Sequence, residues 1–162
     1  MTGVICVYKE KDITSFGVVS KVRGITGERK AGHTGTLDPM ATGVLPVMLG
    51  GATRFLDFLP GSDKSYRAEF ELGRTTDTLD ATGTVLTQTD VTVGKIDVLR
   101  VLQQFRGEIS QLPPMYSAVS VDGKRLYELA RQGKTVERRP RSVTIYALEL
   151  VEADETKHRY TI

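Results

Sequence analysis

The chain has 162 residues, a formal net charge of +2 and 40% hydrophobic residues, enough for one globular domain with a core. No apolar run approaches the roughly 18 residues that a membrane helix needs, and the N-terminus lacks the pattern of a signal peptide. Cys6 is the only cysteine, which excludes an internal disulfide, and His33 and His158 lie too far apart for a metal cluster. We therefore expect a cytoplasmic protein with no membrane segment and no metal.

The first third of the chain predicts a strand and two helices around a glycine-rich motif. Residues 3–8 have the composition of a short strand. A helix is expected over 16–26, capped by Thr14 or Ser15, because four apolar residues share one face: Val18, Val19, Val22 and Ile25. After the motif, a short helix is expected to stop at Pro60.

The middle of the chain predicts a pair of strands and a helix. Residues 64–72 alternate polar and apolar side chains, which indicates a half-buried strand, and 83–89 is expected to be its partner. A helix is expected over 93–106, with Gly107 as its C-terminal cap and one apolar face formed by Ile96, Leu99, Leu102 and Phe105.

The last third predicts a turn, a short helix and two strands. The Asp122-Gly123 pair is a turn signal before a short helix that ends at Gly133. Residues 142–153 and 157–162 indicate two further strands. Because strands and helices mix without regular alternation, we expect an α+β fold with a mixed, largely antiparallel sheet flanked by helices.

The stretch "GHTGTLDPMATGVLP" at 32–46 places one acid, Asp38, among glycines and prolines. As structure alone this pattern is a turn, because Asp-Pro initiates turns and glycine supplies positive φ angles. The apolar run that follows predicts that Asp38 lies near the core, where a carboxylate is costly unless paired or functional. Hydrolysis of glycosidic bonds uses a carboxylate pair, so a lone acid favours rearrangement of a nucleoside's glycosidic bond on one bound group.

A phosphate-binding loop is a second interpretation of this region. "GERKAGHT" at 27–34 is one substitution from a Walker A loop, with His33 in the place of the lysine. That loop needs a strand before it and a helix after it. Here a helix is expected before it, and Pro39 disfavours helical geometry at Asp38. Saturable binding of ATP with magnesium would support this interpretation.

Positive charge gathers between Val121 and Ser142. This segment holds seven Lys/Arg residues against three acids, a net +4 that leaves −2 for the rest of the chain. A basic segment on a near-neutral body suits contact with phosphates, and a solvated helix face with a charged loop has the same composition.

Three segments, in this order, resemble the TruB family of tRNA pseudouridine synthases. They are "AGHTGTLDPMATGVLP" followed by "GGATRF", then "KSYRAEFELGRTTDTLDATG", and then "QLPPMYSAVSVDGKRLYELARQGKTVERRPRSV". The resemblance, which covers most of residues 1–150, implies isomerisation of uridine 55 in the T loop of tRNA to pseudouridine, without a cofactor. It implies the tRNA T-arm stem-loop as partner, and we expect a monomer. The alternative is a non-catalytic RNA chaperone that binds the T arm and is indifferent to Asp38→Asn.

The resemblance also implies roles for individual residues. Asp38 falls on the catalytic aspartate, His33 on a histidine that contacts the T loop, and Tyr66 on a tyrosine that stacks against the flipped uracil. Without the resemblance, His33 would be a loop histidine and Tyr66 a core tyrosine. The stretch at about 115–141 resembles a basic RNA-binding loop that folds over the T arm. The remaining candidates for substrate binding are cations: Lys9, Lys64, Arg125 and Arg131.

Two features depart from the family pattern. The family's N-terminal stretch reads Lys-Pro-x-Gly-x-Thr/Ser-Ser, whereas residues 9–15 read "KEKDITS", with Asp12 in the place of the glycine. Asp tolerates a left-handed conformation better than most residues. Family members also continue past Ile162, with a second tyrosine, an arginine that pairs with the catalytic aspartate and usually a C-terminal RNA-binding region. We therefore interpret residues 1–162 as the N-terminal part of the catalytic domain and predict that activity needs the later strands.

Overall fold

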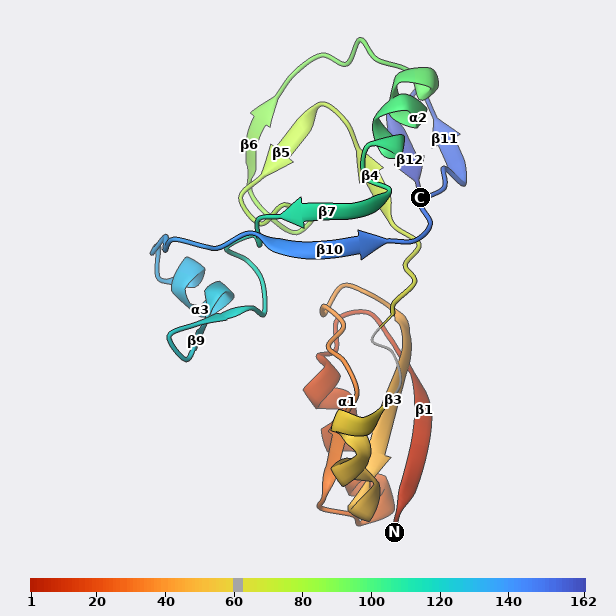
Figure 1. Ribbon diagram of the computed structural model, residues 1–162, viewed down its shortest axis with the longest axis vertical. Coiled ribbons are helices and arrows are strands. Elements are labelled where there is room, and N and C mark those ends of the chain that lie inside the picture. Colours follow the sequence, from red (N-terminus) through yellow and green to blue (C-terminus); the bar gives the residue numbers. More distant parts are fainter. Residues whose placement is uncertain (60–62) are drawn as a thin grey trace. The chain divides into compact units, whose positions relative to one another are not determined.

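The computed structural model describes residues 1–59 and 63–162 and divides the chain into two compact units, Met1–Lys64 and Ser65–Ile162 (Figure 1). We call them unit 1 and unit 2 and describe each by itself. The expected helix stop at Pro60 lies outside the described residues.

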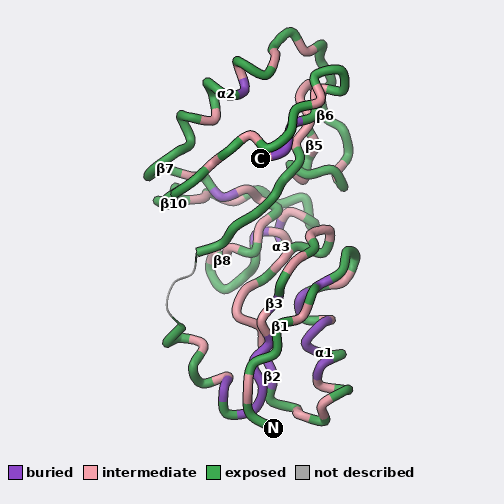
Figure 2. The backbone as a smooth tube through the Cα atoms, turned by 90° about the vertical axis from the view of Figure 1, so that its right-hand side faces the viewer, coloured by how far each residue is buried: buried purple, intermediate pink, exposed green. Residues whose placement is uncertain are grey.

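Unit 1 is an antiparallel three-stranded sheet with one helix packed against it. The strand order is β1 (Gly3–Lys9), β3 (Gly43–Leu49), β2 (Ala31–His33), so β1 lies at an edge of the sheet. Helix α1 (Ser15–Thr26) covers one face, and Figure 2 shows its buried side beside the strands. The 3-10 helix η1 (Gly50–Phe58) follows β3 directly. The core consists of Val18, Val19, Val22, Ala31, Leu45, Val47 and Leu49.

Helix α1 begins where the sequence predicts it. The Thr14 hydroxyl accepts a hydrogen bond from the Gly17 amide at 2.9 Å, which is an N-cap. The helix ends at Gly27, whose φ of 68° is the left-handed C-cap conformation. Ile25 shares the predicted apolar face but is 85% exposed, because it lines a groove beside β1 instead of the core.

Unit 2 contains four small antiparallel sheets, with strand orders β11–β12–β4, β10–β7, β5–β6 and β8–β9. Every strand pair among the described residues is antiparallel, and the α+β class is confirmed. The elements are β4 (Glu69–Glu71), β5 (Arg74–Thr76), β6 (Val85–Gln88), α2 (Lys95–Gln103), β7 (Gly107–Gln111), β8 (Ser120–Val121), β9 (Lys124–Arg125), α3 (Leu126–Arg131), β10 (Arg141–Ile145), β11 (Glu152–Asp154) and β12 (Arg159–Thr161).

The predicted pairing of 64–72 with 83–89 is wrong. Only β4 of the first segment is a strand, and it pairs with β12, near the end of the chain. Strand β6, in the second segment, pairs with β5 across a short loop. Alternation of side chains shows that a strand has one buried face, but it does not identify the neighbouring strand. The sequence pattern therefore gave no basis for pairing 64–72 with 83–89.

The helix predicted over 93–106 is confirmed as α2, but its apolar face is largely uncovered. Val98 is buried, whereas Ile96 is 74% exposed and Leu99 is 41% exposed. The cap also differs: the helix ends at Gln103 with Gln104 as its C-cap, whereas Gly107, with a φ of 84°, begins β7. The spacing of the apolar residues therefore predicted the helix correctly, but it did not predict which side chains of the helix are buried.

The turn and short helix predicted in the last third are confirmed. Asp122 and Gly123, with φ angles of 50° and 79°, join β8 to β9, and Gly133, with φ 70°, follows α3. The segment 142–153, predicted as one strand, holds most of β10 and part of β11, while the segment 157–162 holds β12.

Candidate active-site loop around Asp38

Asp38 lies in the loop between β2 and β3, and hydrogen bonds fix the backbone on both sides of it. The Leu37 amide donates to the hydroxyl of Ser15 at 2.9 Å, and that hydroxyl donates to the Leu37 carbonyl at 3.1 Å. Ser15 is only 3% exposed, so the pair of bonds is shielded from water. The Ala41 amide donates to the Asp38 carbonyl at 3.0 Å, which closes a tight turn.

Lys9 holds the next peptide of this loop from inside the protein. Its side chain is fully buried, and Nζ donates to the carbonyls of Glu10 at 3.0 Å, Ile13 at 2.8 Å and Pro39 at 3.1 Å. A lysine ammonium has three donors, and here each one has an acceptor. The expected role of Lys9 in substrate binding is therefore corrected: a buried lysine with no free donor cannot contact RNA.

Asp12 supports the same contact from the turn before α1. Its amide donates to the Pro39 carbonyl at 2.8 Å, so this oxygen accepts from two residues of that turn. Asp12 has a φ of 67°, the left-handed conformation that glycine adopts most easily. The turn that the family builds with glycine is therefore present here with aspartate.

The carboxylate of Asp38 is exposed, which corrects the prediction that it lies near the core. The apolar run enters the core only with β3, which begins at Gly43, and Asp38 precedes it on the surface. Among the residues that the structure describes, no group donates a hydrogen bond to this carboxylate or forms an ion pair with it. The loop thus combines a fixed backbone with an unengaged carboxylate, an arrangement suited to a group that must reach a bound substrate.

Two further candidates lie in the same unit as Asp38. His33 ends β2 opposite Val47, and its Nδ1 is buried without a hydrogen-bond partner among the described residues. Lys64 lies against the motif: a Cβ built on Gly35 would be 3.5 Å from the Lys64 ammonium. The glycine therefore leaves room for a cation three residues before Asp38.

The other three candidates lie in unit 2. Tyr66 is 62% exposed and precedes β4, so the alternative of a core tyrosine is wrong. Arg125 ends β9, and its guanidinium donates to the Ala118 carbonyl at 2.5 Å. Arg131 ends α3, where its guanidinium carbon lies 5.4 Å from the centre of the Tyr127 ring, a cation–π contact.

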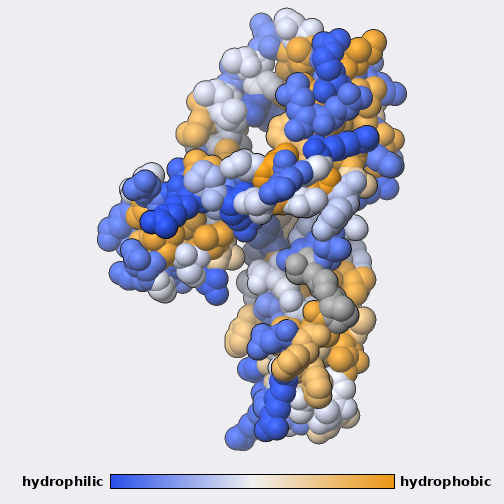
Figure 3. Space-filling view, viewed as in Figure 1, coloured by the Kyte–Doolittle hydropathy of each residue, from blue (hydrophilic) through white to orange (hydrophobic). Residues whose placement is uncertain are grey.

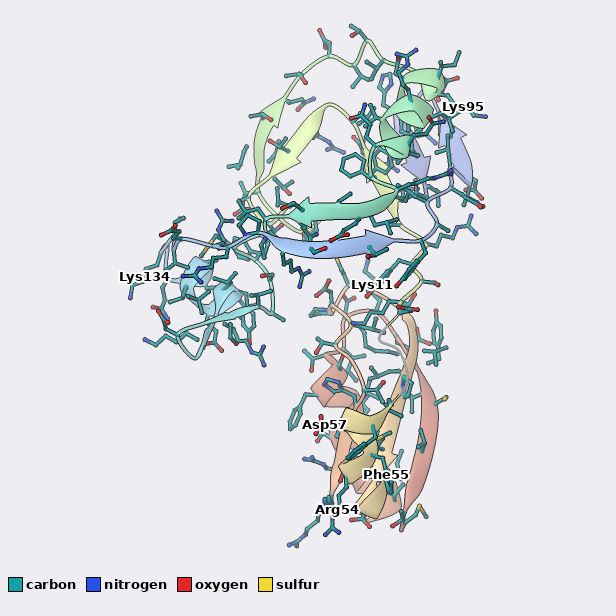
Figure 4. All side chains as sticks on the ribbon, viewed as in Figure 1. Lys11, Arg54, Phe55, Asp57, Lys95 and Lys134 are labelled. Atoms are coloured by element: carbon teal, nitrogen blue, oxygen red, sulfur yellow. The ribbon has the colours of Figure 1, made fainter. Side chains whose placement is uncertain are left out.

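The basic segment at 115–141 has a small apolar centre under its charges. Leu126 is fully buried and Leu129 is 9% exposed, both in α3. Arg138 donates to the Pro113 carbonyl at 3.1 Å, which ties the end of the segment to its beginning. Figure 4 shows Lys134 at the outer end of this segment. The cations are thus carried on a folded element that can present them to a polyanion.

Other kinds of site find no support in the described part of the chain. No group of three His, Cys, Asp or Glu side chains there could hold a metal ion. No helix there is long and apolar enough to cross a membrane. The segment 27–34 also follows α1 and leads into β2, so it lacks the strand-before-helix context of a Walker A loop.

Sequence reasoning missed the role of Ser15, which it considered only as an alternative helix cap. Its hydroxyl instead bonds to a peptide 22 residues away along the chain. The family pattern has a Thr/Ser-Ser pair at this place, and that pair was the one available signal. No local periodicity predicts such a contact.

The chain is similar to named proteins over most of its length. The chain is 51% identical over 162 residues to tRNA pseudouridine synthase B of Pseudomonas putida, covering 100% of this chain and 53% of the relative. It is 50% identical over 155 residues to the protein of the same name from Clostridium tetani, covering 95% of this chain and 54% of that protein. The chain thus spans about half the length of these curated relatives.

Two solved structures are similar to this chain in fold. A Cbf5-Nop10-Gar1 complex matches 98% of this chain and 37% of its own, with a TM-score of 0.67 and 31% identity. An H/ACA RNP bound to a substrate RNA containing 2'-deoxyuridine matches 98% of this chain and 36% of its own, with a TM-score of 0.65 and 28% identity. The model of the TruB family pseudouridylate synthase N-terminal domain matches residues 23–162. The chain belongs to the TruB family of pseudouridylate synthases, and the resemblance seen in its motifs is confirmed.

Proposed function

We propose that this chain supplies the catalytic aspartate and part of the RNA-binding surface of an enzyme that isomerises uridine 55 in the T loop of tRNA to pseudouridine. The observation that carries the proposal is Asp38, whose carboxylate is exposed and unengaged on a backbone bonded at Leu37, Asp38 and Pro39. Such preorganisation lowers the cost of placing a reactive group against its substrate.

The reaction needs only one carboxylate. The bond from N1 of uracil to C1' of the ribose breaks, the base rotates in the site, and C5 bonds to the same C1'. The proton on C5 is lost, and N1 gains one, so no atom is added overall. Asp38 acts either as the nucleophile or as acceptor of a ribose proton, and neither role requires a metal, a cofactor or a second acid.

The target base must leave the T loop before Asp38 can reach its glycosidic bond. Tyr66, 62% exposed, offers an aromatic face for the extruded uracil. His33, at the end of β2, is the candidate contact to the T loop. These roles come from the family pattern, and exposure of the Tyr66 ring supports its part.

The cations provide the contacts to phosphates. Lys64 beside Gly35, together with Arg125 and Arg131 on the basic segment, is suited to the T-arm backbone. Such contacts orient the RNA without reading its sequence. A tRNA substrate favours action in the cytoplasm, and a site loop formed within one chain favours a monomer.

The test is pseudouridine formation in a T-arm stem-loop RNA. Three proteins are compared: the chain alone, the chain continued by the C-terminal half of the Pseudomonas putida synthase, and that longer protein with Asp38→Asn. Asp57→Asn is the matched control, because Asp57 is an exposed aspartate in the same unit (Figure 4). We expect pseudouridine from the longer protein and from its Asp57→Asn variant, and none from its Asp38→Asn variant. Equal product with Asp38→Asn, or RNA binding without product in every form, would overturn the proposal in favour of a T-arm chaperone.

A further inference from the structure

Strand β1 has a free edge beside an apolar groove. It pairs with β3 on one side, and no strand among the described residues pairs with its other side. On that side a groove of about 460 Å³, which we call the β1 groove, separates β1 from α1. Three charged residues line the groove: Glu10, Lys11 and Lys21. The rest of the lining is apolar apart from Thr26, and it consists of Ile5, Val7, Tyr8, Ile13, Val18, Val22, Ile25 and Thr26.

The opposite face of β1 is apolar and open as well. Val4 and Cys6 lie on this face; Val4 is 55% exposed and Cys6 is exposed too. Tyr8, the next residue in the alternation, is 59% exposed and also lines the groove. Val44, the partner of Tyr8 on β3, is 66% exposed. Figure 3 shows apolar side chains reaching the surface of unit 1.

An unpaired strand edge with exposed apolar side chains on both faces is unusual for the surface of a complete folded domain. Native proteins protect edge strands with charges, prolines, bulges or covering elements, because a long apolar edge is a template for another strand. Strand β1 has seven residues, "GVICVYK", with a single charge, and that lysine is buried. Both faces next to this edge are also apolar, so a strand added here would bury side chains on each of its own faces.

We propose that the β1 edge and the β1 groove are the docking surface for a β-strand from the C-terminal half of the synthase. The chain spans 53% of the Pseudomonas putida relative, and the family model that it matches describes the N-terminal domain, so about half of the relatives' length has no counterpart here. The docking strand pairs with β1, fills the groove with one set of side chains and covers Val4 and Cys6 with the other. The inference rests on family membership and not on the proposed reaction, because its readout is binding.

The side chains of β1 argue against a second copy of this chain as the occupant. If β1 of another copy paired with this edge, one side of the added strand would carry Lys9, a side chain already buried in its own fold by three carbonyl contacts. A strand whose side chains are apolar on both faces, and are not already packed in another fold, can pair with β1 without displacing a buried side chain.

Cys6 reports on docking, since it is the only cysteine and lies on the open face of β1. The chain is co-expressed with a tagged C-terminal half of the Pseudomonas putida synthase in which any cysteine is changed to serine. We expect co-purification, slower reaction of Cys6 with a thiol reagent than in the chain alone, and slower hydrogen exchange at alternate amides of β1. Failure to co-purify, or unchanged Cys6 reactivity in the complex, would overturn the proposal.

Two variants place a charge in the groove, and one matched control places it elsewhere. Ile25→Lys, at a side chain 85% exposed, and Ile5→Lys, at one 37% exposed, are expected to weaken the complex about tenfold or more, because a docked strand would bury the new charge. Phe16→Lys, on the same helix as Ile25 but outside the groove and 64% exposed, is expected to leave it unchanged. If all three substitutions weakened the complex equally, the groove would not be the docking surface. If the chain alone formed dimers in which Cys6 is protected from the thiol reagent, the occupant would be a second copy of the chain.

Discussion

Lys9 connects two segments that are distant in sequence, the turn that precedes α1 and the loop that carries Asp38. Its three hydrogen bonds end on carbonyl oxygens, two in the turn and one on Pro39. A buried cation without a carboxylate partner depends on such dipoles to offset its loss of hydration. The identity of this residue therefore bears on the position of Asp38, although Lys9 itself cannot touch a substrate.

Replacing Lys9 with methionine is expected to destabilise the chain by about 2–4 kcal/mol. The carbonyls of Glu10 and Ile13 lose the ammonium that bonds to them, and that of Pro39 keeps only the Asp12 amide, while the side-chain volume is nearly unchanged. In the longer catalytic protein we expect a lower kcat with little change in RNA affinity. Lys11→Met is the control, since Lys11 is exposed in the same turn, and its effect on unfolding should stay within about 0.5 kcal/mol (Figure 4). Equal thermal stability of the Lys9 and Lys11 variants would contradict this account.

Asp154 gives the chain a defined response to acid. Its carboxylate accepts from the Thr156 hydroxyl at 2.6 Å and from the Lys157 amide at 3.1 Å, within the turn between β11 and β12. These hydrogen bonds, with that of Thr156 the largest cause, lower the pKa of Asp154 to about 2.

Because the folded pKa of Asp154 lies below its ordinary value of 3.8, its contribution to stability is present above about pH 4 and is lost as the pH falls toward 2. In thermal unfolding, the difference between the wild type and Asp154→Asn should therefore be largest near about pH 6 and shrink toward about pH 2. Asp57→Asn serves as control. A difference that stayed constant across this range would show that the carboxylate's charge is not involved.

Among the elements, the β5–β6 loop is held by its own side chains. One carboxylate oxygen of Asp80 accepts from the Thr78 hydroxyl at 2.8 Å, the Thr82 amide at 2.8 Å and the Thr82 hydroxyl at 2.6 Å. Gly83 lies so close to Thr78 and Asp77 that a Cβ there would overlap both. The loop therefore depends on glycine for space and not for a positive φ.

Gly83→Ala is expected to destabilise the chain by about 1–3 kcal/mol, because the loop must open to admit the methyl group. The contrast is Gly24→Ala in α1, where a Cβ would meet nothing within 4 Å. That change should stabilise the helix by about 0.5–1 kcal/mol. Thermal or urea unfolding measures both, and the same sign for the two variants would refute the steric argument.

The elements that depend on neighbouring residues could be predicted from the sequence. The N-cap at Thr14, the turn at Asp122-Gly123 and the end of α3 before Gly133 each follow from chemistry within a few residues. The motif that carries Asp38 was also recognisable, because its residue types are specific over many positions. At Asp12 the sequence indicated only that a left-handed conformation would be tolerated, and the structure has it, with a φ of 67°.

The elements that depend on distant residues could not be predicted. The partner of β4 is β12, some 90 residues later, and no pattern in either strand names the other. Exposure of Asp38 depends on where β3 starts, and burial of Lys9 on a carbonyl 30 residues away. Tyr66 was expected on a buried strand face, but the strand begins only at Glu69.

At the scale of the whole molecule, charge is divided unevenly. The segment from Val121 to Ser142 carries +4 and the remainder −2. A phosphate contact releases counterions, so the affinity for RNA should fall with salt in proportion to the number of such contacts.

Lys124→Gln and Lys134→Gln, both at exposed positions of the basic segment, should each reduce the slope of log K against log[salt] by about one unit. Both should weaken binding of unrelated RNA hairpins equally, since phosphates carry no sequence information. Lys95→Gln in α2, outside the segment, is the control (Figure 4). An unchanged slope in the first two variants would locate the RNA contacts elsewhere.

The hydrogen bonds that shape the Asp38 loop also determine when it can form. Every partner of that loop, from Lys9 to Pro46, belongs to unit 1, and the strands that support it pair within Gly3–Leu49. Domains fold as units during synthesis, N-terminal first. The scaffold of the proposed catalytic carboxylate can therefore be complete on the ribosome before most of the basic segment has been translated. The nascent chain would then expose the unpaired edge of β1 for the time that translation of the rest requires.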